Sequence, residues 1–135
     1  KMKTAGSICY EIAYPDLVAS QSADADFLLT VSNDSWFGGS LGPHQHLQMA
    51  QMRARENGRE LVRATSNGIS AFVDVNGGIV SRSAQFEVVT LRGTVQAYSG
   101  VTPFQRWGST PIIVLCGLLL LGLLRWAKQA QLRAD

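Results

Sequence analysis

Residues 5–31 read Ala-Gly-Ser-Ile-Cys-Tyr-Glu-Ile-Ala-Tyr-Pro-Asp-Leu-Val-Ala-Ser-Gln-Ser-Ala-Asp-Ala-Asp-Phe-Leu-Leu-Thr-Val. The first five of these residues predict a short strand, and Pro15-Asp16 then begins a predicted helix over 14–21. Residues 27–31 are a continuous apolar run, which is typical of a strand buried on both faces of a parallel sheet. A strand, a helix and a second buried strand in this order predict an α/β fold.

The residues after this run predict a loop and a second helix. A glycine-rich loop over 32–43 leaves the buried strand, and Pro43 begins a helix that continues to about Asn57, before Gly58. The apolar side of this helix is predicted to consist of Leu47, Met49, Ala50, Met52 and Ala54.

A β meander is predicted next. Residues 61–64 and 69–75 have strand composition, and Asn76-Gly77-Gly78 is a strong hairpin signal that leads into a strand over 79–83. A last strand is expected over about 86–95, followed by a connector that contains Pro103. Helices and buried strands therefore come first, and the meander follows.

A membrane-spanning segment is predicted near the C-terminus, because residues 107–124 contain no charge. As a helix they extend roughly 27 Å, close to the roughly 30 Å hydrocarbon core of a bilayer. Pro111 suits a first helical turn, and Trp107 and Trp126 suit the two membrane interfaces. A buried helix of a soluble protein is the alternative, but it needs a larger protein around it. We predict one transmembrane helix with interfacial flanks over 104–126.

The charges after this segment predict its orientation. The stretch after the apolar run contains only one acidic residue, Asp135, and three basic residues: Arg125, Lys128 and Arg133. The positive-inside rule therefore places the tail, residues 127–135, in the cytoplasm and residues 1–103 on the other side of the membrane.

The composition excludes other classes of protein. With 135 residues and 46% hydrophobic content, the chain is long enough for one compact core. Its net charge is only +2, and the basic residues are scattered, so a nucleic-acid partner is not expected. The two cysteines predict no disulfide framework, and Cys116, in the middle of the apolar run, is expected to be inert.

Cys9 is the candidate nucleophile. It stands at the end of a short apolar strand and before a polar turn, where α/β enzymes expose nucleophiles and offer backbone N–H groups to an oxyanion. On position alone, a buried and inert cysteine is the more common outcome.

The neighbours of Cys9 carry a family resemblance. Cys9-Tyr10-Glu11, followed by residues 32–38 with the sequence Ser-Asn-Asp-Ser-Trp-Phe-Gly, is similar to the nitrilase superfamily, whose catalytic cysteine precedes an aromatic residue and a glutamate. Further stretches, in order along the chain, resemble the apolipoprotein N-acyltransferase branch of that superfamily. They are Gly42-Pro43-His44-Gln45-His46, Met49-Ala50-Gln51-Met52-Arg53-Ala54, Arg63-Ala64-Thr65-Ser66-Asn67-Gly68 and Thr102-Pro103-Phe104-Gln105-Arg106-Trp107-Gly108.

This resemblance implies a fold and an activity. Residues 1–103 are expected to form the C-terminal half of a nitrilase-like α-β-β-α sandwich, followed by the transmembrane helix. The implied enzyme moves a fatty acyl chain from a phospholipid, with phosphatidylethanolamine expected as donor, through a cysteine thioester. The acceptor is the N-terminal amino group of S-diacylglyceryl-cysteine in apolipoproteins, at the last step of lipoprotein maturation. The resemblance implies no cofactor, and it places the enzyme in the bacterial inner membrane with its catalytic part in the periplasm.

The family uses a Glu-Lys-Cys triad, and the resemblance assigns only the cysteine here, at Cys9. The glutamate and lysine are expected upstream of Lys1, so this chain alone is expected to be inactive. The backbone N–H of Tyr10 is expected to bind the oxyanion, and Glu11 to support the nucleophile or the substrate amine.

Two pairs in the loop after the second strand are substrate-site candidates. Trp36 and Phe37 are expected to line an acyl channel or to enter lipid, and the equal alternative is that they fill the domain core. Asn33 and Asp34 are expected to shape the loop through side-chain to backbone hydrogen bonds rather than to react.

The histidines and arginines after this loop are predicted to have structural roles and to bind no metal. His44 and His46 point in different directions at a helix start and have no carboxylate cluster beside them, so no metal site is expected. Four arginines could meet phospholipid headgroups, but a solvated helix face with Glu56 and Glu60 as partners is the preferred interpretation. They are Arg53, Arg55, Arg59 and Arg63.

Two competing functions remain open at this point. A membrane-tethered nitrilase-type amidase or other C–N hydrolase would use Cys9 in the same way, with water in place of the lipoprotein amine. A catalytically inert membrane-bound interaction module would leave Cys9 unreactive.

Overall fold

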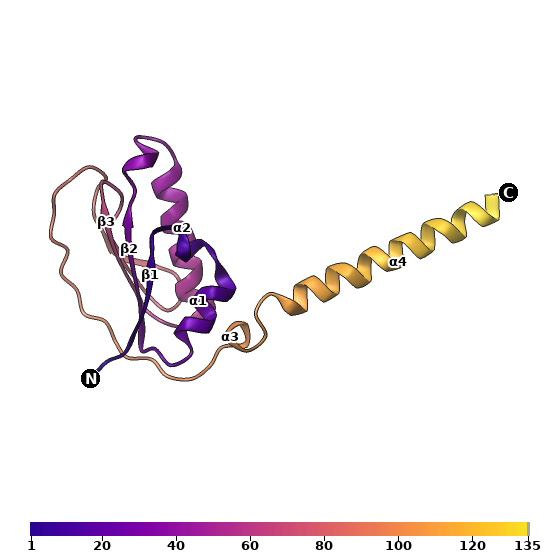
Figure 1. The fold of residues 1–135 in the computed structure, drawn as a ribbon, viewed down its shortest axis with the longest axis horizontal. Helices are drawn as coiled ribbons and strands as arrows, with labels where there is room; N and C mark the ends of the chain where they lie inside the picture. The colour runs from indigo at the N-terminus through magenta and orange to yellow at the C-terminus, as the bar shows by residue number, and fades with distance from the viewer. Residues whose placement is uncertain (135) are drawn as a thin grey trace.

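The structure is a computed structural model that describes residues 1–134, and its fold is drawn in Figure 1. One five-stranded sheet has the order β1 (Thr4–Ile8), β2 (Phe27–Asn33), β3 (Leu61–Ser66), β4 (Ala71–Val73) and β5 (Ile79–Arg82). The first three strands are parallel, and β4 and β5 continue the sheet antiparallel. The predicted α/β fold is therefore confirmed, and so are the first three strands of the predicted meander.

The crossover segments contain the helices. The 3₁₀ turn η1 (Cys9–Ala13) and the helix α1 (Pro15–Ser22) connect β1 to β2, and the 3₁₀ turn η2 (Ser35–Phe37) and the helix α2 (Gly42–Asn57) connect β2 to β3. Figure 1 shows α1 and α2 on the same face of the sheet. The buried apolar core lies between these helices and the sheet. It consists of Ala5, Ile12, Val18, Ala25, Leu28, Leu47, Ala50, Ala54, Leu61, Ile69, Ala71 and Val73.

Helix α2 follows the sequence signals closely. It begins around Pro43 and ends at Gly58, whose φ of +57° is the left-handed conformation that glycine adopts at little cost. Leu47, Ala50 and Ala54 are buried as predicted. Met52 was wrongly placed on the apolar side, because its position faces away from the sheet and it is 51% exposed.

The prediction that β2 is buried on both faces is wrong. Leu28 and Thr30 are buried under the helices, whereas Val31, which points to the opposite face, is 43% exposed. Successive strand residues alternate between the two faces, and both helices cover the same one. Within this chain, the second face of β2 is therefore only partly covered.

No strand forms over 86–95, contrary to prediction. The segment lies against the face of the sheet opposite the helices, where Gly93 approaches the ring of Phe72 closely. The residues just after this segment are bound elsewhere, since the Gln96 N–H donates to the Glu60 carboxylate at 2.7 Å and the Tyr98 N–H donates to the Asp26 carbonyl at 3.2 Å. Phe86 has a φ of +65°, which is incompatible with an extended strand at that residue.

The hairpin between β4 and β5 forms at the predicted residues. The Asp74 carboxylate accepts hydrogen bonds from the backbone N–H groups of Asn76 at 2.7 Å and Gly78 at 2.9 Å, and Gly77 has a φ of +83°. β5 is one residue shorter than the predicted strand over 79–83, and β4 covers only residues 71–73 of the predicted 69–75.

A short helix docks the C-terminal segment on the domain. The expected connector is the helix α3 (Pro103–Trp107), in which Thr102 is the N-cap and forms a capping box with Gln105. Gln105 also donates to the Ser22 hydroxyl at 3.0 Å, and the Ser109 N–H donates to the Asp16 carboxylate at 3.0 Å. The start of α1 is thus tied to the residue before the last helix.

Helix α4 (Thr110–Ala134) contains most of the predicted membrane segment. Its residues Thr110–Gln129 are long and apolar enough to cross a bilayer, with a mean hydropathy of 2.0, and none of that stretch is buried against the rest of the chain. The predicted segment 104–126 is divided between α3 and α4, and the helix continues through residues predicted to be a tail. Asp135 lies outside the described residues.

Candidate active site

Cys9 lies in a constrained turn at the carboxyl end of β1. The strand ends at Ile8, and Cys9 begins η1 with a φ of +55°, a left-handed conformation that costs a residue with a side chain about 1 kcal/mol or more. The Glu11 carboxylate accepts a hydrogen bond from the Ile8 N–H at 2.7 Å and so closes the turn. Such strain at a strand end is found where a side chain must be held in an exposed position.

The thiol of Cys9 faces Ser32 on the neighbouring strand. Ile8 pairs with Val31 in the parallel register, and the Cys9 Sγ lies 3.7 Å from the Ser32 Oγ. The pKa of the thiol is lowered, first by the Ser32 hydroxyl and then by the backbone N–H groups of Asn33 and Tyr10, while burial and the Asp34 charge act in the opposite direction. The site therefore favours the thiolate, which is the nucleophilic form.

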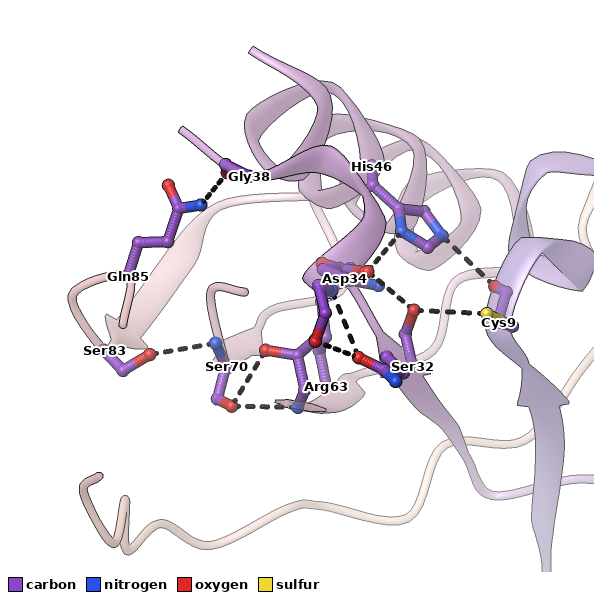
Figure 2. Close-up of polar contacts among 12 residues, drawn as sticks. Cys9, Ser32, Asp34, Gly38, His46, Arg63, Ser70, Ser83 and Gln85 are labelled. Atoms are coloured by element: carbon purple, nitrogen blue, oxygen red, sulfur yellow. Dashed lines mark hydrogen bonds and ion pairs between the residues drawn. The ribbon is translucent and has the colours of Figure 1, made fainter. Parts of the chain in front are cut away.

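Asp34 is the hub of a buried polar network behind this thiol (Figure 2). Its Oδ1 accepts hydrogen bonds from the Ser32 Oγ at 2.7 Å and the His46 Nδ1 at 3.0 Å, and its Oδ2 accepts from the Arg63 Nη2 at 2.8 Å. Asp34 is only 1% exposed. Gly68 allows this burial, because a Cβ at that position would collide with the carboxylate.

Arg63 supplies the charge that balances Asp34. Its side chain, on β3, is fully buried, and burial lowers the pKa of the guanidinium while Asp34 opposes that shift. The interpretation of the arginines as a solvated face is wrong, because Arg53, Arg59 and Arg63 are all buried. The expected partner Glu56 does bind the Arg53 guanidinium, whereas the Arg59 guanidinium donates to the carbonyl oxygens of Ala25 and Gly100. Of the four arginines, only Arg55 is exposed.

His46 connects the hub to the nucleophile. Its Nε2 lies 3.1 Å from the carbonyl oxygen of Cys9, and its ring neighbours those of Tyr10 and Phe37 at centroid distances of 6.4 and 6.2 Å. His44 points elsewhere and is exposed. In the part of the chain that the structure describes, no three His, Cys, Asp or Glu side chains gather closely enough to hold a metal ion.

The predicted loop residues have different environments. Asn33 shapes the loop as expected, since its Oδ1 accepts from the Ser35 N–H at 3.1 Å. Asp34 does not act in that way, because its carboxylate binds side chains instead. Trp36 is 87% exposed and Phe37 is 37% exposed, so the alternative that Trp36 fills the core is wrong for this chain.

Three residues of the network were not predicted as site residues: Ser32, His46 and Arg63. The helical spacing of His46 with Ala50 and Ala54 could have placed it on the buried side of α2. Arg63 is two residues after Leu61 on β3, so both side chains point to the same, helix-covered face. Nothing in the local sequence, however, indicates that these side chains meet Asp34.

The family model of the carbon-nitrogen hydrolases matches residues 2–103, which include the complete sheet and the network around Cys9. The chain belongs to this family. Among solved structures, it is similar to a carbon-nitrogen hydrolase from Helicobacter pylori, with a TM-score of 0.56 and 15% identity over 64% of this chain and 38% of that chain. An amidase from Nesterenkonia sp. has a TM-score of 0.52 and 22% identity over 62% of this chain and 34% of that chain. These likenesses confirm the carbon-nitrogen hydrolase fold.

The resemblance to the apolipoprotein N-acyltransferases is also confirmed. The chain is 54% identical over 129 residues to the apolipoprotein N-acyltransferase of Shewanella oneidensis, covering 94% of this chain and 25% of the relative. It is 50% identical over 113 residues to that of Pseudomonas putida, covering 84% of this chain and 22% of the relative. This carbon-nitrogen hydrolase chain thus spans about a quarter of the length of these relatives.

The positive φ of Cys9 predicts an unusual order of stabilities among its variants. We expect Cys9→Gly to be more stable than Cys9→Ala by about 1 kcal/mol, because glycine adopts φ values near +55° without a Cβ clash. At an ordinary helix or strand position, alanine is the more stable of the two by about 0.5–1 kcal/mol. Thermal unfolding of the two full-length variants in detergent measures the difference. A more stable alanine variant would contradict a strained turn.

Proposed function

We propose that this chain supplies the nucleophile and a membrane anchor of an enzyme that N-acylates lipoproteins. The observation that carries the proposal is the placement of Cys9, whose thiol points at Ser32 from a strained turn at the carboxyl edge of a parallel sheet. The identity to apolipoprotein N-acyltransferases and the membrane-length helix α4 support the choice of reaction. Residues 1–103 are then part of the catalytic domain, 104–126 the membrane segment with its flanks, and 127–135 a cytoplasmic tail.

In the first step, the Cys9 sulfur attacks the ester carbonyl carbon of a phospholipid, with phosphatidylethanolamine as the expected donor. A C–S bond forms and the ester C–O bond breaks. The thiol proton passes through the glutamate of the family's triad to the departing lysophospholipid hydroxyl. The backbone N–H of Tyr10 and the lysine of the triad stabilise the oxyanion.

In the second step, the α-amino group of the S-diacylglyceryl-cysteine attacks the thioester. A C–N bond forms, the C–S bond breaks, and an amine proton returns to the sulfur, so that the thiol is regenerated. The product is an amide, which is much less reactive than the thioester. Glu11 holds the turn that presents the sulfur, through its bond to the Ile8 N–H.

The surface around Cys9 suits substrates with acyl chains. Several large apolar side chains at the end of β1 and in the segments that follow β1 and β2 are exposed: Ile8, Tyr10, Tyr14, Trp36 and Leu41. Exposed apolar groups gathered beside a site mark contact with apolar ligands or with lipid. We assign Trp36 and Phe37 to the acyl chain or the lipid surface, and Asn33 and Asp34 to the support of the loop that carries them.

A membrane anchor fits this reaction, because both substrates hold their chains in the bilayer at about 0.8 kcal/mol per buried CH₂. The hydrogen bonds from Ser109 to Asp16 and from Gln105 to Ser22 fix the catalytic domain against the start of α4. The reaction is proposed to take place on the periplasmic side of the bacterial inner membrane, with the C-terminus in the cytoplasm.

Mass spectrometry of the intact full-length protein tests this function. The protein and its Cys9→Ala variant are incubated with phosphatidylethanolamine in detergent. Their masses are measured before and after treatment with neutral hydroxylamine. We expect a fatty-acyl mass increment that hydroxylamine removes and that the variant lacks. No increment, with Cys9 still open to alkylation, would favour the tethered amidase or other C–N hydrolase. An unreactive Cys9 would favour the inert interaction module.

A further inference from the structure

The partners of His46 restrict its protonation state. The Nδ1 faces a carboxylate oxygen of Asp34 at 3.0 Å, and the Nε2 faces the carbonyl oxygen of Cys9 at 3.1 Å. A carbonyl oxygen can only accept a hydrogen bond, so the Nε2 must carry a proton to bind it. An ionised carboxylate also only accepts, so the Nδ1 must carry a proton as well.

The two other neighbours of the Asp34 carboxylate are both hydrogen-bond donors. Arg63, which is always charged, donates to the Oδ2 at 2.8 Å, and the Ser32 hydroxyl donates to the Oδ1 at 2.7 Å. All three partners of the carboxylate therefore act as donors. A neutral His46 would place a nitrogen lone pair against an acceptor oxygen in a buried site, which costs about 1–3 kcal/mol.

We infer that His46 is a positioning residue that works as an imidazolium, tying the Cys9 carbonyl to Asp34 and placing positive charge behind the thiol. This role rests on the proposed function of Cys9 as the nucleophile. His46 does not touch the sulfur and removes no proton from it. It holds the strained turn by a charge-assisted hydrogen bond, which is roughly twice as strong as a neutral one.

The charges around the thiol give this role an electrostatic consequence. Glu11 lies on the turn itself, Asp34 follows β2, His46 stands on α2, and Arg63 stands on β3 behind Asp34. The negative charge of Asp34 by itself disfavours the thiolate. With His46 as a cation, the buried trio of Arg63, Asp34 and His46 carries a net charge of +1 and favours the thiolate instead.

The hydrogen bonds of the Ser32 hydroxyl also favour His46 as a cation. It has one proton and two acceptors, the Asp34 carboxylate and the Cys9 thiolate. When Cys9 ionises, the hydroxyl turns to donate to the sulfur and leaves the carboxylate. Asp34 then keeps two charged donors, His46 and Arg63, so the loss of the third is offset.

The pH dependence of Cys9 alkylation tests the inference without any lipid. Full-length wild type, His46→Gln and the matched control His44→Gln are treated with iodoacetamide from about pH 5 to pH 9, and the modified Cys9 peptide is quantified. His46→Gln should move the profile to higher pH and slow alkylation at pH 7 roughly three- to tenfold, because a neighbouring positive charge is lost. His44→Gln, in an exposed side chain on the same helix, should match the wild type.

A second measurement avoids dependence on a folded variant. His46 follows Gln45, whereas His44 follows Pro43, so carbon labelling of glutamine carbonyls and nitrogen labelling of histidine selects His46 within this chain in solid-state NMR. We expect both ring nitrogens of His46 to be protonated at pH 7. A neutral ring, or an alkylation profile of His46→Gln that equals that of the wild type, overturns the inference. Either result leaves the thioester test of Cys9 unaffected.

Discussion

Replacing Cys9 with alanine is expected to abolish lipoprotein N-acylation, with a loss of about 10⁴-fold or more in turnover. The reason is that both proposed steps pass through a bond to its sulfur, and the removal of a nucleophile leaves only the contributions of binding and oxyanion stabilisation. Turnover is measured as the mass shift of a diacylglyceryl lipopeptide incubated with phospholipid and the full-length enzyme in detergent.

The other cysteine is the matched control. Cys116 lies within the stretch of α4 that is long and apolar enough to cross a membrane, with no titratable neighbour nearby in the sequence. Cys116→Ala should therefore retain wild-type turnover. A Cys9→Ala enzyme within tenfold of the wild type would exclude Cys9 as the nucleophile, whatever the behaviour of the control.

Replacing Arg63 with methionine is expected to have the largest effect on stability. Arg63→Met leaves the Asp34 carboxylate fully buried without its guanidinium partner, and breaking a buried ion pair in this way costs about 3–5 kcal/mol. The unfolding temperature of the full-length protein should fall by roughly 10 °C. Differential scanning of the purified protein in detergent measures the change.

Two further variants separate the buried charge from the loss of packing. Arg55→Met, in the exposed arginine of α2, should change the unfolding free energy by no more than about 0.5 kcal/mol. Adding Asp34→Asn to Arg63→Met should recover part of the stability, because the buried carboxylate that has lost its guanidinium donor is then removed. Equal unfolding temperatures for Arg63→Met and Arg55→Met would show that the buried pair does not stabilise the fold.

Much of the candidate site could be predicted because its signals are local. Cys9, Tyr10 and Glu11 are adjacent in the chain, and their resemblance to the nitrilase superfamily identifies the candidate nucleophile before any tertiary contact is known. Position after a short apolar strand alone favours a buried and inert cysteine. Asn33 shapes its own loop through Ser35, two residues away, which is also a local effect. The partners His46 and Arg63 of Asp34 could not be predicted, because they lie 12 and 29 residues further along the chain.

The sequence by itself determined the order of strands and helices, the ends of α2 at Pro43 and Gly58, the hairpin at 76–78 and the apolar length of the last helix. These features depend on backbone preferences and on periodicity within a few residues. Tertiary structure alone decided which face of β2 is covered, that 86–95 pairs with no strand, and that Arg53, Arg59 and Arg63 are buried. The physical reason is that burial depends on what packs against a residue from distant parts of the chain. A charged side chain such as Arg63 can therefore enter the core once Asp34 offers it a partner.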